Sequence, residues 1–280
     1  MKDLSRSLRS RTIHFVCAFT CLALASALPA AAAQQTYKPR IGQKGKDVVW
    51  IPSPEGMVEK MLDMAHVTPQ DFVVDLGSGD GRNVIAAARR GARALGVEYN
   101  ADLVALSRDT AAAAGVADKA TFVQGDMYEA DISKATVLVL FLIPLNLMKL
   151  TPKFLQLQPG TRIVSNTYEI GGGWEPDETD RLAQCLSWCV AHLYVVPANV
   201  AGTWALPDGE LALDQEFQKV TGTREIGGIR VPIENGKLRG NEIRFTINAV
   251  EYTGVVNGDR MQGVAKGRVT SEWSAKRIAN

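Results

Sequence analysis

Five short apolar segments alternate with helical segments between residues 72 and 167, and this alternation constrains the fold more than any other feature. The segments between the apolar runs repeat apolar residues at helical spacing. Apolar strands that alternate with helices are typical of a mostly parallel sheet covered by helices on both faces. The sequence therefore predicts an α/β fold. The expected strands are residues 72–76, 94–98, 120–124, 135–142 and 162–167.

Local signals place the expected helix ends and one further strand. Ser53 is predicted to cap a helix that has Pro54 at its first position, and Asn100 is predicted to cap the helix after the second strand. The helix between the last two of the five strands is expected to break near Pro152, because proline removes a helical hydrogen bond. Residues 194–196 could add a late strand at the edge of the sheet.

The C-terminal part of the chain shows a different pattern. Apolar and polar residues alternate with period two, which is typical of half-buried strands. Two dipeptides, Asn235-Gly236 and Asn257-Gly258, are strong signals for hairpin turns. We therefore expect an antiparallel β domain after the α/β domain.

We divide the chain into an α/β domain at residues 48–200 and a small β-rich domain at residues 201–280. Trp204 near the start of the β domain and Trp273 near its end resemble the frame of a small lipocalin-like meander. Such a domain could cover or stabilise the α/β domain. Alternatively, it could hold an apolar ligand or recruit a protein.

The N-terminus carries the pattern of a secretory signal peptide at residues 1–33. Four basic residues precede an uncharged stretch, and Ala31-x-Ala33 is a cleavage pattern that predicts a mature chain from Gln34. The apolar run could instead remain as an anchor, and the basic residues before it place the rest of the chain outside in either case. We therefore expect an exported protein, periplasmic or secreted, with no membrane span after cleavage. Residues 34–47 are polar and are expected to form a flexible lead-in.

The charge that remains after the leader argues against a nucleic-acid partner. The chain has 31 Lys and Arg and 30 Asp and Glu, of which the leader holds four and one. The remaining 27 basic and 29 acidic residues give a net charge of −2. Bulk charge of this sign attracts no polyanion.

Two cysteines remain after the leader, Cys185 and Cys189. Their spacing is too wide for a relaxed disulfide on a helix and wider still on a strand. We therefore expect two buried free thiols. Since no histidines stand at ligand spacing beside them, no metal site is predicted.

The stretch from Val73 to Gly81, Val-Val-Asp-Leu-Gly-Ser-Gly-Asp-Gly, is the most informative motif. A glycine-rich turn between a first strand and a first helix lets a ligand approach the backbone. Ligands of doubly wound sheets bind at the carboxyl ends of the strands. A dinucleotide fingerprint would need its third glycine at Arg82, one residue later than Gly81. A nicotinamide or another nucleotide and a purely structural turn are therefore the weaker alternatives.

The pattern Asp-x-Gly-x-Gly-x-Gly resembles the first motif of class I S-adenosylmethionine-dependent methyltransferases. Glu98 ends the second strand, where these enzymes carry the acidic residue that binds the ribose hydroxyls, and residues 125–127 (Gly-Asp-Met) match the segment that contacts adenine. The resemblance implies a Rossmann-like sheet, methyl transfer and S-adenosylmethionine as the cofactor. The residues it implies for cofactor binding are Asp75, Gly77, Ser78, Gly79, Glu98, Asp126 and Met127.

Other stretches resemble the protein-lysine methyltransferase subgroup that includes the mitochondrial ATP synthase c-subunit lysine methyltransferase. By this resemblance, residues 141–144 end the fourth strand and face the methyl group, and the acceptor is an amine such as that of a protein lysine. Phe141 stands where amino methyltransferases usually carry a polar residue, so no catalytic base is assigned. The matching stretches are residues 50–54, 75–82, 141–144, 160–165 and 174–176. The residues expected in the substrate pocket are Pro52, Phe141, Pro144, Asn166, Tyr168 and Trp174.

Two functions compete at this point. The first is a methyltransferase that acts on an amine, and the second is an exported binding protein that uses the β domain beside a non-catalytic scaffold. Export conflicts with the cytoplasmic supply of S-adenosylmethionine. The protein could act outside with imported or leaked cofactor, act before export or from an internal start such as Met57, or bind something else as an exported relic.

Overall fold

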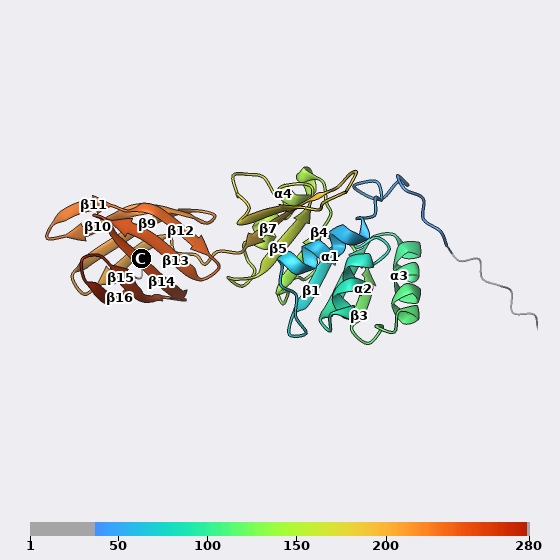
Figure 1. Cartoon of the computed structure of the whole chain (residues 1–280), viewed down its shortest axis with the longest axis horizontal. Coiled ribbons are helices and arrows are strands. Elements are labelled where there is room, and N and C mark those ends of the chain that lie inside the picture. Colours follow the sequence, from blue (N-terminus) through green and yellow to red (C-terminus); the bar gives the residue numbers. More distant parts are fainter. Residues whose placement is uncertain (1–36, 279–280) are drawn as a thin grey trace, which may run out of the picture. The chain divides into compact units, whose positions relative to one another are not determined.

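The computed structural model describes residues 37–278, which form an α/β domain followed by an antiparallel β-barrel (Figure 1). The expected signal peptide at residues 1–33 lies outside the described residues. Among the residues that are described, every helix is too short or too polar to cross a membrane.

Within the described part of the chain, the sheet of the α/β domain has seven strands. They are β1 (Phe72–Leu76), β2 (Arg93–Glu98), β3 (Ala120–Gln124), β4 (Val137–Leu140), β5 (Arg162–Asn166), β6 (Glu178–Arg181) and β7 (Val190–Val195). The order is β3-β2-β1-β4-β5-β7-β6. β1 to β5 are parallel, and β7 and β6 extend the sheet through antiparallel pairs. From β1 the sheet continues through β2 and β3 on one side and through β4 and β5 on the other. Sheets of this kind bind ligands at the point between β1 and β4 where the strand order reverses.

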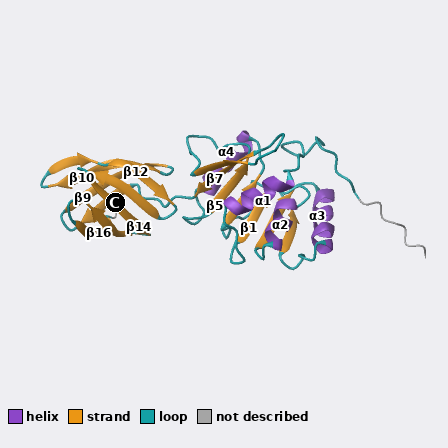
Figure 2. Ribbon diagram, in the orientation of Figure 1, coloured by secondary structure: helices purple, strands orange, loops and turns teal. Residues whose placement is uncertain are grey.

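Helices cover both faces of this sheet (Figure 2). They are α1 (Glu55–Met64), α2 (Arg82–Arg89), α3 (Ala101–Ala113) and α4 (Pro144–Phe154). Because successive strand residues point to opposite faces, Val73 and Val137 pack with α1, α2 and α3, whereas Val74 and Leu138 pack with α4. The predicted α/β fold with a mostly parallel sheet is confirmed.

The start of α1 differs from the sequence prediction. The helix begins at Glu55, and Pro54 rather than Ser53 occupies the capping position. The Ser53 hydroxyl instead accepts a hydrogen bond from Nδ2 of Asn166 at 3.0 Å. This bond links the loop before α1 to the end of β5. The Asn100 cap is confirmed, since its side chain accepts two backbone N–H groups of α3.

The predicted break at Pro152 is wrong, because α4 continues through this proline to Phe154. Proline cannot donate a hydrogen bond to the carbonyl four residues earlier, which here belongs to Met148. Met148 is 51% exposed, so water can replace the missing donor. The proline also lies close to the end of the helix, so it can disturb few other backbone hydrogen bonds.

The late strand expected at residues 194–196 is longer and lies inside the sheet. β7 pairs with β5 on one side and with β6 on the other. β6 has the sequence Glu-Thr-Asp-Arg and lacks the apolar alternation of a typical strand. This short polar strand forms the edge in place of the more apolar β7, which is a common way to protect a sheet.

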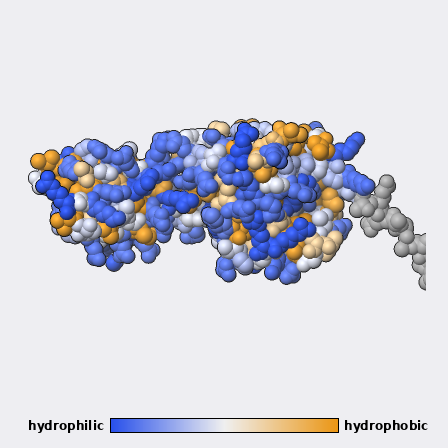
Figure 3. Space-filling model, viewed as in Figure 1, coloured by the Kyte–Doolittle hydropathy of each residue, from blue (hydrophilic) through white to orange (hydrophobic). Residues whose placement is uncertain are grey.

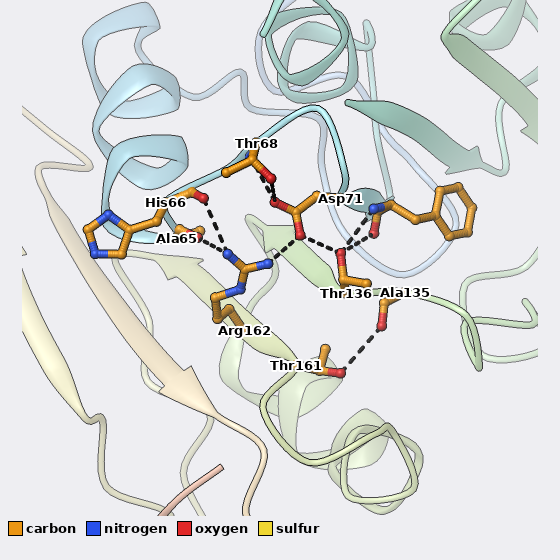
Figure 4. Close-up of polar contacts among 9 residues, drawn as sticks. Ala65, His66, Thr68, Asp71, Ala135, Thr136, Thr161 and Arg162 are labelled. Carbon is orange, nitrogen blue, oxygen red and sulfur yellow. Dashed lines mark hydrogen bonds and ion pairs between the residues drawn. The ribbon is translucent and has the colours of Figure 1, made fainter. Parts of the chain in front are cut away.

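An ion-pair network connects the amino ends of the parallel strands, opposite the ligand-binding edge. Arg162 at the start of β5 donates to the carbonyl of Ala65 at 2.6 Å and pairs with Asp71 before β1 (Figure 4). Asp71 also accepts hydrogen bonds from the backbone of Thr68 at 2.8 Å and from the hydroxyl of Thr136 at 2.7 Å. One carboxylate therefore joins the end of α1 to three strands.

The C-terminal domain, residues 202–277, is an antiparallel sheet that closes on itself. Its strands are β8 (Gly202–Leu206), β9 (Gly209–Glu216), β10 (Lys219–Ile226), β11 (Ile229–Pro232), β12 (Glu234–Arg239), β13 (Glu242–Ile247), β14 (Val250–Asn257), β15 (Arg260–Lys266) and β16 (Thr270–Arg277). Pairing of β9 with β10 closes the barrel, and β11 adds to β10 from outside the ring. Trp204, Phe245 and Trp273 belong to its apolar interior.

The two predicted hairpin signals in this domain have different outcomes. Asn257-Gly258 lies at the hairpin between β14 and β15, as predicted. Asn235-Gly236 lies inside β12, where the register shifts, and Asn235 has a φ of 54°. Asn and Gly tolerate the positive φ that a tight turn requires, and at this position the same tolerance permits a β-bulge.

The surface is mainly hydrophilic where it can be seen. On the face shown in Figure 3, hydrophobic residues are scattered among hydrophilic ones over both the α/β domain and the barrel. The apolar side chains instead gather in the clusters between the sheet and its helices and inside the barrel. Each domain thus has its own core.

Candidate active site

A cavity of about 340 Å³ lies at the carboxyl ends of the parallel strands. Its walls come from the turn after β1, the ends of β2 and β3, the segments after β4 and β5, and residues 43–51 before α1. The reversal of strand order between β1 and β4 falls within this region. The cavity therefore occupies the position predicted for a ligand site in such a sheet.

The glycine-rich turn forms one side of the cavity. The backbone N–H groups of Gly77 and Ser78 both donate to the carbonyl of Val97, at 2.8 and 3.1 Å, and hold the turn against β2. The hydroxyl of Ser107 on α3 donates to the carbonyl of Gly79 at 3.1 Å. Of the three turn residues expected to bind the cofactor, Gly77 lines the cavity, whereas Ser78 and Gly79 are not part of its wall.

Glu98 connects the end of β2 to this turn and lines the cavity. Its Oε2 accepts the backbone N–H of Gly79, and its Oε1 accepts that of Asn100, both at 2.9 Å. A carboxylate can accept about four hydrogen bonds in total. Each oxygen therefore keeps acceptor capacity for a ligand with hydroxyl groups.

Asp75 lies beneath the turn rather than in the cavity wall. It is 2% exposed, and its Oδ2 accepts a hydrogen bond from Nδ2 of Asn83 at 3.0 Å. Burial raises the pKa of Asp75 well above its ordinary value, and the charges of Glu98 and Asp80 raise it further, while the Asn83 bond opposes them. The structure thus places Asp75 where it can position the turn.

Asp126 and Met127, which the resemblance implies for cofactor binding, line the cavity after β3. Nζ of Lys46 lies 2.5 Å from Oδ2 of Asp126, and the backbone N–H of Tyr128 donates to Oδ1 at 2.9 Å. These two contacts, the first above all, lower the pKa of Asp126. Asp126 is therefore a carboxylate at neutral pH, with one oxygen engaged by Lys46.

Residues 40–50 form a short hairpin that contributes to the cavity wall. The N–H of Gly42 donates to the carbonyl of Trp50, and the N–H of Trp50 donates to the carbonyl of Gln43, both at 2.9 Å. The sequence predicts a flexible lead-in for most of this segment, whereas the structure gives it a defined path. Trp50 lines the cavity and is a site residue that the sequence prediction omits, although it begins one of the matching stretches.

The side of the cavity formed by the segments after β4 and β5 is aromatic. Phe141 follows β4, Tyr168 lies two residues after β5, and Trp188 precedes β7. We call these three side chains the aromatic wall. Phe141 and Tyr168 were among the residues expected in the substrate pocket, and the sequence prediction omits Trp188.

Four other residues expected in the substrate pocket lie outside the cavity wall: Pro52, Pro144, Asn166 and Trp174. Asn166 is fully buried and binds Ser53. Trp174 is 1% exposed and stacks on Phe217, with ring centroids 5.6 Å apart. Pro144 is exposed at the first position of α4, and Pro52 lies in the loop before α1. The structure thus gives Trp174 the role of a core anchor.

Cys185 and Cys189 form a disulfide, so the expectation of free thiols is wrong. Both lie between β6 and β7, outside helix and strand, and their Cα atoms are 5.7 Å apart. A turn brings residues of this spacing into the normal range for a disulfide, which neither regular structure does. Paired cysteines behind an expected export signal were the feature that could have indicated the bond. Within residues 37–278, no three His, Cys, Asp or Glu side chains gather as metal ligands would.

Known proteins resemble the α/β part of the chain. Residues 75–178 match the ANTKMT methyltransferase domain. The chain is 39% identical over 152 residues to the protein-lysine N-methyltransferase of Saccharolobus islandicus, covering 53% of this chain and 94% of the relative. It is 35% identical over 131 residues to the mouse lysine N-methyltransferase of the ATP synthase c-subunit, covering 46% and 52%.

One solved structure supports the same relationship. A crystal structure of an RNA methyltransferase from Salinibacter ruber in complex with S-adenosyl-L-homocysteine aligns with a TM-score of 0.50 and 45% identity, covering 54% of this chain and 96% of that chain. The chain thus spans nearly all of the archaeal relative and of this structure, but about half the length of the mouse relative. The barrel lies beyond the region that matches the family.

Proposed function

Since this chain belongs to the family of the ANTKMT methyltransferase domain, we propose that it methylates the side-chain amine of a lysine in a protein. The chain is an S-adenosylmethionine-dependent methyltransferase. The observation that carries the proposed acceptor is the composition of one cavity, which has Glu98 and Asp126 near the ends of β2 and β3 and the aromatic wall after β4 and β5. The archaeal and mouse relatives are lysine methyltransferases by name.

The residues near β1 to β3 fit S-adenosylmethionine. This cofactor carries a sulfonium, a ribose diol and an amino acid head but no phosphate, so carboxylate and carbonyl oxygens suit it. Glu98 has free acceptor capacity and would hold the diol, and Asp126 and Met127 would lie at the adenine. When bound, S-adenosylmethionine supplies an electrophilic methyl group, and its sulfur keeps the electron pair of the broken carbon–sulfur bond.

The aromatic wall provides an environment that suits an amine nucleophile. A lysine amine must lose its proton before its lone pair can form the new nitrogen–carbon bond. The ring faces attract the ammonium form and hold it at the wall, and the amine that attacks is the fraction that has released its proton. Holding that nitrogen against the methyl carbon supplies much of the acceleration. The proton released by the acceptor can pass to solvent.

RNA is the second candidate acceptor, because the Salinibacter structure is named as an RNA methyltransferase. Two observations favour a protein. Val49 and Ile143 line the cavity and are 48% and 36% exposed, which gives its opening an apolar character suited to a protein surface. The net charge of −2 after the leader gives little attraction to a polyanion.

We also propose that the protein acts after export. The signal pattern at residues 1–33 and the Cys185–Cys189 disulfide support this location, because disulfides persist mainly in oxidising compartments. N-terminal sequencing of the protein from separated cell fractions tests it. A chain that begins at Gln34 in the exported fraction is the expected result, and an intact Met1 in the cytoplasm would contradict export.

The acceptor is tested by incubating cell extract with methyl-labelled S-adenosylmethionine and the purified enzyme, followed by mass-spectrometric mapping of the label. We expect label on lysine side chains of one or a few proteins, and no such label with the Glu98→Ala variant. Label confined to RNA would establish the second candidate instead. Label in neither fraction would contradict both acceptors.

A further inference from the structure

The three rings of the aromatic wall lie together although they come from three separate loops. The centroid of the Phe141 ring lies 6.4 Å from that of Tyr168 and 5.4 Å from that of Trp188, and the last two are 6.3 Å apart. Phe141 and Tyr168 are within 22° of parallel, and Trp188 is tilted by 59° and 53° to them. Because all three line the cavity, they present one aromatic surface to it.

Such a surface attracts a cation through the ring faces, and tryptophan does so most strongly. The carboxylates that line the cavity belong to other segments, namely Asp47 in the hairpin, Glu98 after β2 and Asp126 after β3. A cation at the aromatic wall would therefore be held by π faces rather than by a carboxylate beside it. This arrangement suits an ammonium group that carries methyl groups, since it has few N–H donors and an apolar surface.

The disulfide encloses the residue that completes this wall. Trp188 lies between Cys185 and Cys189 and has a φ of 61°, in the left-handed region that non-glycine residues rarely adopt. Leu186 and Ser187 in the same loop are exposed, so they offer the loop little packing. A strained conformation of this kind persists where its surroundings fix it. The crosslink and the contacts of the Trp188 ring are the features that can fix it here.

We propose that the aromatic wall binds the methylated, cationic form of the acceptor ammonium and that the Cys185–Cys189 disulfide holds Trp188 where this binding requires it. The acceptor site is thus complete only in the oxidised chain. This inference rests on the proposed methylation of a lysine amine. Its test is a binding measurement and needs no turnover, so its failure can be told apart from failure of the proposed function.

The test compares two probes of the same shape. The full chain, loaded with S-adenosylhomocysteine, is titrated with N-acetyl-trimethyllysine amide and with its neutral isostere, in which carbon replaces the side-chain nitrogen. The indole N–H resonance of Trp188 in ¹⁵N-labelled protein reports binding. We expect the cation to bind about tenfold more tightly than the isostere, the size expected of cation–π contacts in a partly desolvated site.

Variants assign that preference to Trp188. Trp188→Ala should remove most of the preference for the cation, and Trp188→Phe should keep part of it because an aromatic ring remains. Calorimetry measures the binding of both probes to these variants. Leu186→Ala is the matched control, since this exposed neighbour lies in the same loop, and it should leave the preference unchanged. Unchanged S-adenosylhomocysteine affinity shows that each variant is folded. If Trp188→Ala does not fold, the parent and Trp188→Phe still decide the question.

Reduction tests the role of the disulfide. Dithiothreitol delivers two electrons and two protons, which convert the disulfide to two thiols while the reagent closes to its own cyclic disulfide. We expect the preference for the cation to fall toward that of Trp188→Ala without loss of S-adenosylhomocysteine affinity. The Cys185→Ala/Cys189→Ala double variant should behave like the reduced chain with and without dithiothreitol.

Three results would overturn the inference about the wall: equal affinity for the two probes, no saturable binding of the cation, or an undiminished preference in Trp188→Ala. A preference that survives reduction would overturn the role of the disulfide. If cell extracts show no labelled lysine while the cation preference is present, the proposed acceptor fails and the binding site stands.

Discussion

The indole of Trp50 approaches the glycine-rich turn so closely that a Cβ atom on Gly79 would lie 2.5 Å from its Nε1 and 2.9 Å from its Cδ1. Gly79 also has a φ of 56°. The hairpin of residues 40–50 and the turn after β1 therefore fit together only while this position lacks a side chain. Because Trp50 lines the cavity, this contact couples the turn to the wall that the hairpin supplies.

We expect Gly79→Ala to weaken binding of S-adenosylhomocysteine by about tenfold, because the added methyl group must displace Trp50 from the cavity wall. Isothermal titration calorimetry measures the effect. Gly115→Ala is the control, since Gly115 has a φ of 70° and open space around it, so it carries a similar backbone cost without the contact. Equal affinities of the two variants would show that the approach of Trp50 does not matter for binding.

Glu98→Gln should weaken cofactor binding by about tenfold to a hundredfold, because hydrogen bonds to a charged acceptor contribute about 1.5–3 kcal/mol. Glutamine keeps the shape of the side chain but replaces one acceptor oxygen by an amide that faces a backbone N–H. Calorimetry with S-adenosylhomocysteine measures the loss. Glu129→Gln, at an exposed position outside the cavity wall, should bind like the parent. An unaltered affinity of Glu98→Gln would remove Glu98 from the site.

Lys46→Met should speed the release of S-adenosylhomocysteine by about twofold to fivefold, as expected for loss of an exposed ion pair. Lys46 connects the hairpin to Asp126 and lies 5.2 Å from the ring centre of Tyr99, so it helps to keep the hairpin in place. Stopped-flow displacement measures the rate. Added salt should speed release from the parent more than from the variant, because salt screens the pair. Lys38→Met, at an exposed position outside the cavity wall, is the control. A release rate of Lys46→Met equal to that of the parent would contradict the role of Lys46.

The strands β1, β4 and β5 were predictable because each is an apolar run that the sheet buries on both faces. Val73 and Val74 illustrate this, since they pack against helices on opposite sides. β6 was not predictable in this way, because a polar edge strand is defined by its pairing with β7 rather than by its composition. The position of Glu98 at the end of β2 was likewise predictable from the end of an apolar run.

The aromatic wall of the cavity was harder to predict from the sequence. Phe141, Tyr168 and Trp188 meet only because three loops converge, and no local pattern encodes that contact. Asn166 ends the same strand that leads to Tyr168, yet its side chain binds Ser53 beside α1. A residue's position at the end of a strand therefore predicts that it lies near the site, but it does not predict which way its side chain points.

Asp71 should make folding stability depend on pH. Burial alone would raise the pKa of Asp71, but the hydrogen bonds of Thr68 and Thr136 and the charge of Arg162 outweigh it, and its pKa lies below the ordinary value. A carboxyl group of lowered pKa stabilises the folded state above the pKa of the unfolded chain, which is about 3.9. That contribution is lost as the pH falls through the folded pKa, because the folded state must then take up the proton.

Asp71→Asn should therefore lower the free energy of unfolding by about 1–3 kcal/mol at pH 7, the usual cost of leaving charged hydrogen-bonding partners unsatisfied. The difference from the parent should shrink as the pH falls below about 4, because the unfolded chain then takes up its proton before the folded chain does, and it should vanish below the folded pKa. Urea unfolding across this pH range measures both effects. Asp63→Asn removes a carboxylate that is 71% exposed and pairs with Arg90, so its effect should be much smaller. A difference between Asp71→Asn and the parent that stays constant down to pH 3 would show that the carboxylate charge contributes nothing to stability.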